Sequence, residues 1–274
     1  MKSNSIGKFV LGMILAAPAS CLAGIDVSIT VAPPALPVYS QPVIPGDGYI
    51  WTPGYWAYGP EGYFWVPGAW VLAPRPGLLW TPGYWGFAGG FYGWHAGYWG
   101  PHVGFYGGVN YGFGYGGVGF GGGRWEGGHF AYNTAVANVN TTVIHNTYVD
   151  RTVVVSNTEN RTSFNGPNGV RAVPTAQERA AMNEPHVAPV AAQTSHEQAA
   201  RADRTQLATV NHGRPANAAV SRPIATAPAH SAPAHPQAVA QSRPAGQPQA
   251  QAKPQSKPQP KPKGKPAEHP EEKK

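Results

Sequence analysis

The alternation of apolar and polar residues predicts a strand near the N-terminus. From Ile25 to Val31 the two kinds of side chain alternate with a period of two, which is typical of a half-buried β-strand. The residues from Ala32 to Pro45 are rich in proline and favour an extended conformation. Residues 24–47 are therefore expected to form a strand and a proline-rich lead-in.

A tryptophan pattern, W-x-x-G-x-W, then recurs four times, at residues 51–56, 65–70, 80–85 and 94–99. Three copies have Pro-Gly at their centre, which fits a type II turn because proline fixes its own φ and glycine tolerates a positive one. The pattern predicts that each copy is a tight hairpin, with Trp51 opposite Trp56 in the first. Successive hairpins would form a meander of short strands.

Two further stretches predict strands. From Val103 to Tyr115 most apolar side chains fall on odd positions and most glycines on even ones, so a strand there would have one bare face that packs closely against the tryptophans. This stretch completes a β module at residues 48–130. Residues 131–170 are rich in Asn and Thr and are expected to form strands that end at the turn Asn165–Gly169.

The C-terminal part predicts short helices and then a tail. Thr175-x-x-Glu178 and Thr194-x-x-Glu197 are capping-box patterns, and Arg201 lies four residues after Glu197. Residues 171–212 are expected to be a connector with short, marginal helices. Residues 213–274 contain no aromatic residue and many Pro, Ala, Gln and Lys, which predicts a disordered basic tail. The fold class is therefore mostly β.

The tandem array resembles the bacterial YXWGXW, or WxxGxW, repeat-containing proteins. The resemblance is carried by the four tryptophan copies, the proline-rich lead-in, the glycine-aromatic stretch, the segment Arg124–Phe130 and the Asn/Thr-rich strands, and it covers about residues 24–170. It implies an exported protein with this architecture. It implies no mechanism, because the family has no established biochemical activity.

Residues 1–23 have the features of a secretory signal peptide. Lys2 and Lys8 precede a short apolar run, and Cys21-Leu22-Ala23 is a small-x-small cleavage site. Cleavage after Ala23 would leave a mature chain without cysteine and without a transmembrane helix. The alternative is that Cys21 is lipidated and tethers the protein to a membrane. Both routes predict a location in the periplasm, at the outer membrane or on the cell surface.

The positive charge is confined to the tail. The formal net charge of the chain is +7, and residues 213–274 hold ten Lys or Arg against three acidic residues. Between Gly24 and His212 there are eight Arg, no Lys and ten acidic residues. The folded part therefore lacks a basic face, and no specific nucleic-acid partner is expected.

Catalytic groupings are not evident in the sequence. The acidic residues in and beside the β module are far apart in the chain and are Asp47, Glu61, Glu126 and Asp150. Two G-x-G-x-x-G strings, at residues 112–117 and 114–119, lack the strand and helix that a dinucleotide site requires. The sequence predicts that the protein is not an enzyme and uses no cofactor.

Two sets of side chains are candidates for binding. Tryptophans that are exposed on a β surface can stack on sugar rings, whereas buried ones form a core. These candidates are Trp51, Trp56, Trp65, Trp70, Trp80, Trp85, Trp94 and Trp99. Imidazoles that converge can bind a transition metal, and these candidates are His95, His102, His129 and His145.

The sequence favours a non-enzymatic structural or interaction protein of the cell envelope or cell surface. A carbohydrate-binding module for envelope glycans is the first alternative, and a periplasmic metal binder that uses histidine is the second. Candidate partners are an envelope polysaccharide or another envelope protein. Self-association is a further candidate interaction, because open sheet edges can pair with another copy of the chain.

Overall fold

The computed structural model describes residues 29–155 and 161–224. The secretory signal, Cys21, most of the predicted strand Ile25–Val31 and the tail beyond Ile224 lie outside this part. The described part is mostly β, as predicted. Its strands are β1 (Tyr49–Thr52), β2 (Tyr55–Gly59), β3 (Gly62–Val66), β4 (Ala69–Leu72), β5 (Leu79–Thr81), β6 (Tyr84–Ala88), β7 (Phe91–His95), β8 (Tyr98–Gly100), β9 (Asn110–Gly112), β10 (Tyr115–Gly116), β11 (Gly123–Glu126), β12 (His129–Asn133), β13 (Thr147–Tyr148) and β14 (Phe164–Asn165). Its helices are α1 (Ala176–Met182), α2 (Ala191–Ala202), the 3-10 helix η1 (Arg204–Gln206) and α3 (Ala208–Asn211).

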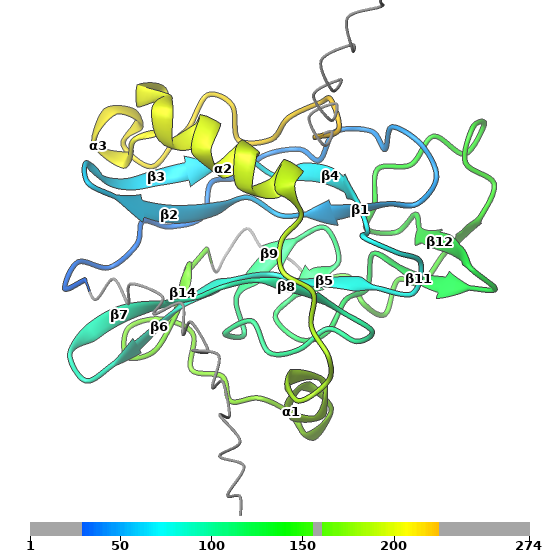
Figure 1. The fold of residues 1–274 in the computed structure, drawn as a ribbon, viewed down its shortest axis with the longest axis horizontal. Helices are drawn as coiled ribbons and strands as arrows, with labels where there is room; N and C mark the ends of the chain where they lie inside the picture. The colour runs from blue at the N-terminus through cyan, green and yellow to red at the C-terminus, as the bar shows by residue number, and fades with distance from the viewer. Residues whose placement is uncertain (1–28, 156–160, 225–274) are drawn as a thin grey trace, which may run out of the picture. The chain divides into compact units, whose positions relative to one another are not determined.

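Two long antiparallel ribbons form the framework. In the first ribbon β1 pairs with β4 and β2 with β3, and in the second β5 pairs with β8 and β6 with β7. Each ribbon is one hairpin whose two arms are interrupted opposite each other, at the centres of two W-x-x-G-x-W copies. The two ribbons lie one above the other in Figure 1, and the Trp85 indole N–H donates to the Trp56 carbonyl across them at 2.8 Å.

The prediction that each copy is a hairpin was wrong, because each hairpin contains two copies. Trp51 lies opposite Trp70, and Trp56 lies opposite Trp65. A type II turn needs a glycine with positive φ, and the four central glycines are not among those with positive φ. The chain therefore runs straight through each Pro-Gly, and the hairpin turns lie between β2 and β3 and between β6 and β7.

The predicted strand from Val103 to Tyr115 was also wrong in its extent. The chain forms only the short strands β9 and β10, because φ is positive at Gly107, Gly108 and several later residues. Its packing against the tryptophans is confirmed. The Tyr115 hydroxyl is the donor to two backbone carbonyl oxygens, that of Trp51 at 3.2 Å and that of Trp80 at 3.0 Å.

The Asn/Thr-rich stretch contributes shorter strands than the sequence predicted. Strand β12 pairs with β11 on one side and in parallel with β13 on the other, and β14 adds to the second ribbon beside β6. Ile144 is buried, whereas Val143 and Val149 are exposed. Most of the other described residues of this stretch form turns and loops.

Helix α1 begins where the sequence predicted. Thr175 is its N-cap, and the reciprocal hydrogen bonds with Glu178 form a capping box. Helix α2 begins at Ala191 rather than beside Thr194, so the prediction of its start was wrong. The Thr194 hydroxyl instead bonds to the Ala191 carbonyl within the helix. The expected Glu197–Arg201 pair is present, with N···O at 3.8 Å.

The C-terminal segment packs back onto the first ribbon. Phe64, Val66, Ala200 and Leu207 form a small buried cluster between β3 and the helices, and α2 crosses over this ribbon in Figure 1. Residues 213–224, which the sequence assigned to the disordered tail, are ordered. Within them, the Ala218 carbonyl accepts from the Gly68 amide, and the Val220 amide donates to the Gly68 carbonyl.

Within the part that the structure describes, no helix is both long enough and apolar enough to cross a lipid bilayer.

Candidate functional site

Tryptophans from different copies meet in four cross-strand pairs. In each pair, the first tryptophan of one copy contacts the second tryptophan of the other copy in the same ribbon. The ring centroids are 5.2 Å apart in all four, with the planes tilted by 53–67°. The pairs are Trp51–Trp70, Trp56–Trp65, Trp80–Trp99 and Trp85–Trp94. Two of the pairs are edge-to-face and two are tilted, and aromatic pairs that are not face-to-face stabilise a fold beyond the area that they bury.

The central glycine of each copy lies directly under an indole ring. A Cβ at Gly68 would lie 2.5 Å from Cζ2 of Trp51, and one at Gly97 would lie 2.5 Å from Cζ2 of Trp80. Gly54 and Gly83 make the equivalent contacts with Trp65 and Trp94. The motif needs glycine because the ring occupies the space of a side chain.

Seven of the eight repeat tryptophans are core residues. Their exposed fractions range from 0% to 7%, and only Trp94 is half-buried. The second tryptophan of each copy also donates its indole N–H to a segment outside its own ribbon. The acceptors are the carbonyls of Ala35, Pro42 and Trp56 and the side chain of Gln193, at 2.8–3.1 Å. The array therefore fixes the lead-in, the other ribbon and α2.

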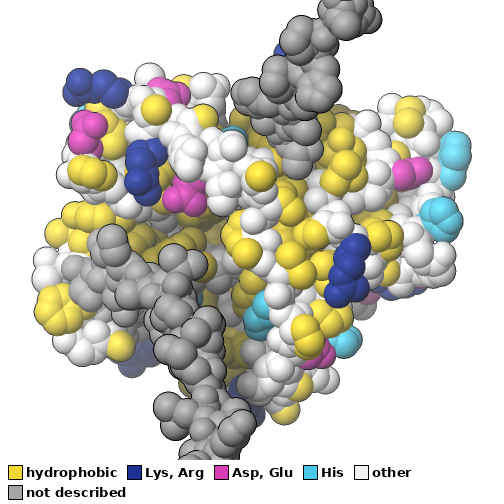
Figure 2. Space-filling view, viewed as in Figure 1, with side chains coloured by type: hydrophobic (Ala, Val, Ile, Leu, Met, Phe, Trp, Pro, Cys, Tyr) yellow, Lys and Arg dark blue, Asp and Glu magenta, His cyan; other side chains and the backbone are white. Residues whose placement is uncertain are grey.

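A cavity of about 100 Å³ lies where the centres of all four copies approach one another beneath α2. Figure 2 shows hydrophobic side chains gathered across the middle of this face, between the two ribbons. The cavity is lined by Thr52, Pro53, Tyr55, Val66, Pro67, Trp80, Pro82, Gly83, Trp94, Ala96, Gly97, Tyr111, Pro189, Gln193, Thr194, His196, Glu197 and Ile224.

Aromatic rings from both ribbons meet at this cavity. Tyr55 of the first ribbon stacks on Trp94 of the second, with centroids 5.1 Å apart and planes inclined by 17°. The Tyr111 hydroxyl donates to the Gly83 carbonyl at 2.7 Å. Burial raises the pKa of the Tyr111 hydroxyl well above its ordinary value, so this hydroxyl keeps its proton far into the alkaline range.

Helix α2 supplies the ionisable groups of the cavity. The Tyr55 hydroxyl donates to Oε2 of Glu197 at 2.8 Å, and burial, helped by the Glu197 charge, raises the pKa of Tyr55 well above its usual value. The His196 ring donates from Nε2 to the Pro67 carbonyl at 2.8 Å. Desolvation lowers the pKa of His196, which favours the neutral ring near pH 7.

The histidines that the sequence singled out are not among the described residues that line this cavity, and they make separate contacts. His95 stacks on Tyr84 with centroids 4.4 Å apart, while His129 and His145 are exposed on β12 and on the loop before β13. Across residues 29–155 and 161–224, no three His, Cys, Asp or Glu side chains come together as a metal site.

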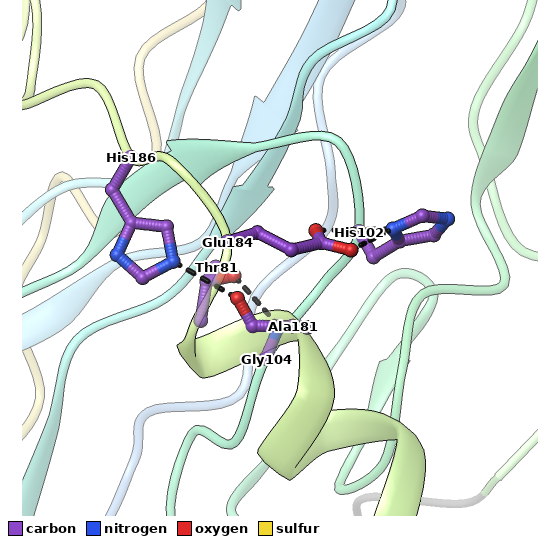
Figure 3. A network of polar contacts seen from close by, with 6 residues as sticks. All are labelled: Thr81, His102, Gly104, Ala181, Glu184 and His186. Atoms are coloured by element: carbon purple, nitrogen blue, oxygen red, sulfur yellow. Dashed lines mark hydrogen bonds and ion pairs between the residues drawn. The ribbon is translucent and has the colours of Figure 1, made fainter.

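His102 belongs to a polar network between the second ribbon and α1 (Figure 3). Its Nδ1 lies 2.8 Å from Oε1 of Glu184. His186 stacks on Tyr98, with centroids 3.7 Å apart, and donates from Nε2 to the Ala181 carbonyl at 3.0 Å. The network fastens the end of α1 to the ribbon.

The carboxylates that sequence analysis weighed for catalysis are not gathered at one place. Glu126 pairs with Arg124 at 2.6 Å, and Asp150 accepts from Thr152. Asp47 precedes β1, and Glu61 lies in the exposed turn between β2 and β3.

Sequence reasoning missed Tyr55, His196 and Glu197 as neighbours. Tyr55 and Glu197 are 142 positions apart, and no pattern links them. The only sequence signal was the spacing of Glu197 and Arg201, which indicated a helix face.

Comparison with known proteins gives one match. The family described as WXXGXW repeat (2 copies) matches residues 46–71. No curated protein and no solved structure matches the chain. The matched residues coincide with the first ribbon, Tyr49–Leu72, so the two-copy unit of the family corresponds to one complete ribbon here. The second ribbon, Leu79–Gly100, repeats the same pairing.

Proposed function

Because residues 46–71 match the WXXGXW repeat family and the second ribbon repeats the same pattern, we propose that the chain acts as a non-enzymatic structural or interaction protein of the cell envelope or cell surface. One observation carries the structural role. The repeat tryptophans pair across strands and are almost all buried, so the repeat serves to build a rigid aromatic scaffold.

The scaffold organises segments that are distant in the sequence. Indole N–H groups hold the lead-in at Ala35 and Pro42, and Trp65 holds the C-terminal segment at Ala218. Such a framework is suited to presenting loops and strand edges to a partner, because binding surfaces need rigid support.

The polar contacts support a role without catalysis. The Nε2 atom of His196 is hydrogen-bonded to the Pro67 carbonyl, and Nδ1 of His102 contacts the Glu184 carboxylate. General acid or base chemistry needs such a group to face a reacting proton. A second carboxylate close to Glu197, as paired acid catalysis requires, is not present among the residues that line the described cavity.

The carbohydrate-binding alternative has less support. Stacking on a sugar needs an open ring face, and seven of the eight candidate rings are in the core. Trp94 is the half-buried exception, and its ring is already stacked on Tyr55. A metal-binding role has less support again, since His95, His129 and His145 make no common site.

The proposal of export rests on the sequence of residues 1–23. The test is fractionation of bacterial cells that express the full chain, a chain without residues 2–23, or a Cys21→Ala chain. We expect the full chain in the periplasmic or envelope fraction and the truncated chain in the cytoplasm. A Cys21→Ala chain that leaves the membrane fraction would indicate a lipid anchor. A full chain that stays in the cytoplasm would overturn the proposal.

The interaction role needs its own test. The mature chain should sediment with isolated envelopes or with envelope polysaccharide, and bovine serum albumin serves as the negative control. If the folded chain sediments with no envelope fraction, the interaction role is lost even where export is observed.

A further inference from the structure

The cavity between the two ribbons has room for a small chemical group. Its volume is about 100 Å³, and a cavity of roughly 150 Å³ is known to take up a benzene ring. A compact group of about five heavy atoms is of this order of size. Four aromatic residues line the cavity, Tyr55, Trp80, Trp94 and Tyr111, together with prolines from three of the copies.

The charge of the cavity is negative. Among its described lining residues Glu197 is the one acid, and neither Lys nor Arg is present. The pKa of His196 is lowered by burial, so the imidazole adds no positive charge near neutral pH. An aromatic lining with one carboxylate and no basic side chain favours a cation over an anion, and an apolar outer surface on that cation suits the aromatic and proline walls.

We infer that this cavity binds a small organic cation, an alkylammonium group, with Glu197 as its counter-ion and Tyr55, Trp80 and Trp94 as aromatic walls. A metal ion is a poor fit because the cavity offers one carboxylate and few other oxygen ligands. A neutral apolar ligand would gain no charge attraction from the Glu197 carboxylate. The inference does not depend on where in the cell the protein acts.

Arg201 makes the inference specific. Its guanidinium is 3.8 Å from Oε1 of Glu197, with half of its side chain exposed, and it lies 5.5 Å from the centroid of Phe64 outside the cavity. Arg201 therefore competes weakly with a bound cation for the same carboxylate. Removing its charge should tighten binding of the cation, which a purely structural role for Glu197 does not predict.

The test is titration of the mature full-length chain with tetramethylammonium chloride at constant ionic strength. Tryptophan fluorescence and saturation transfer to the methyl protons report binding, which we expect at on the order of millimolar concentration. The Glu197→Gln variant keeps an acceptor for Tyr55 and should bind about tenfold more weakly. Arg201→Gln should bind about threefold more tightly, because the competing charge is gone.

Matched controls separate charge recognition from general effects. Glu61→Gln makes the same charge change in the exposed turn of the first ribbon and should bind like the wild type. Tert-butanol, a neutral molecule of similar shape, should bind far more weakly than tetramethylammonium. Should Glu197→Gln fail the circular-dichroism check of folding, Trp94→Leu takes its place and should also weaken binding.

Three results would overturn the inference: no saturable binding to the wild type, equal binding to the Glu197→Gln chain, or equal binding of tert-butanol. Free choline and phosphatidylcholine vesicles then distinguish the source of the cation. Binding of choline without vesicle sedimentation would identify a dissolved ligand. Sedimentation of the wild type, but not of Glu197→Gln, with the vesicles would identify a lipid head group.

Discussion

The indole ring of Trp51 lies over Gly68 on the opposite arm of the same ribbon, where a Cβ would be 2.5 Å from its Cζ2 atom. The reciprocal contact joins Trp65 to Gly54. Each copy thus receives the first tryptophan of its partner copy and gives its own in return. This exchange makes the pair of copies, rather than the single copy, the structural unit of each ribbon.

The first prediction concerns this contact. Gly68→Ala should lower the free energy of unfolding by about 1–3 kcal/mol, because the methyl group would overlap a fixed ring and the nearby Gly54 amide. Gly68 is not among the residues with positive φ, so the loss comes from crowding rather than from backbone strain. Urea denaturation measures it.

Gly93→Ala is the matched control. Gly93 lies in β7, and a Cβ there would meet nothing within 4 Å. We expect no loss of stability and a gain of up to about 1 kcal/mol, since alanine restricts the unfolded chain. Equal losses for the two variants would contradict the contact as the origin of the glycine requirement.

The repeat was evident in the sequence, but its pairing was not. A Pro-Gly step is compatible with a type II turn, and only the ring that covers Gly54 or Gly68 in the folded protein excludes the bend. Likewise, the alternation after Val103 indicated a strand, yet glycines with positive φ divide it. Local patterns predict which residues are buried more readily than which strand lies opposite.

The candidate site was less predictable than the fold. Tyr55 meets Glu197 across most of the described chain, and the capping-box pattern at Thr194 placed the start of α2 too late. Residues 213–224 were assigned to the tail on composition, because the backbone bonds of Ala218 and Val220 to Gly68 leave no trace in side-chain pattern. Contacts between residues so far apart in the sequence depend on tertiary packing.

The second prediction concerns tryptophan accessibility. Trp94 and Trp125 are half-buried, while the other seven tryptophans are buried. Acrylamide should therefore quench a minor part of the fluorescence. The double variant Trp94→Phe/Trp125→Phe should lose most of this accessible part, whereas Trp56→Phe should retain it. Uniform quenching of the wild type would show that the rings are not in a closed core.

The third prediction compares two threonines with the same T-x-x-E pattern. Thr175 caps α1, so Thr175→Ala should cost about 1 kcal/mol locally and raise hydrogen exchange of the α1 amides roughly fivefold. Thr194 lies inside α2 and bonds to Ala191, so Thr194→Ala should leave exchange in α2 nearly unchanged. Exchange is read by mass spectrometry. Equal effects would mean that both residues act as caps.

The fourth prediction concerns alkaline pH. Burial raises the pKa of the Tyr39, Tyr111 and Tyr115 hydroxyls above the value of about 10 that tyrosine has in an unfolded chain. Above that pH the unfolded chain loses protons that the folded chain keeps. The free energy of unfolding therefore falls as pH rises from the unfolded towards the folded pKa, by ~1.4 kcal/mol per pH unit for each such group.

This coupling should make tyrosine ionisation and unfolding one event. Tyrosinate absorbance should rise together with the loss of the native circular-dichroism signal above about pH 10. Tyr115→Phe loses its hydrogen bonds to Trp51 and Trp80, so it should be less stable at neutral pH but show a shallower decline with pH. The interpretation fails if these hydroxyls ionise near their ordinary pKa while the native signal persists, because a buried tyrosinate would then carry no cost in this core.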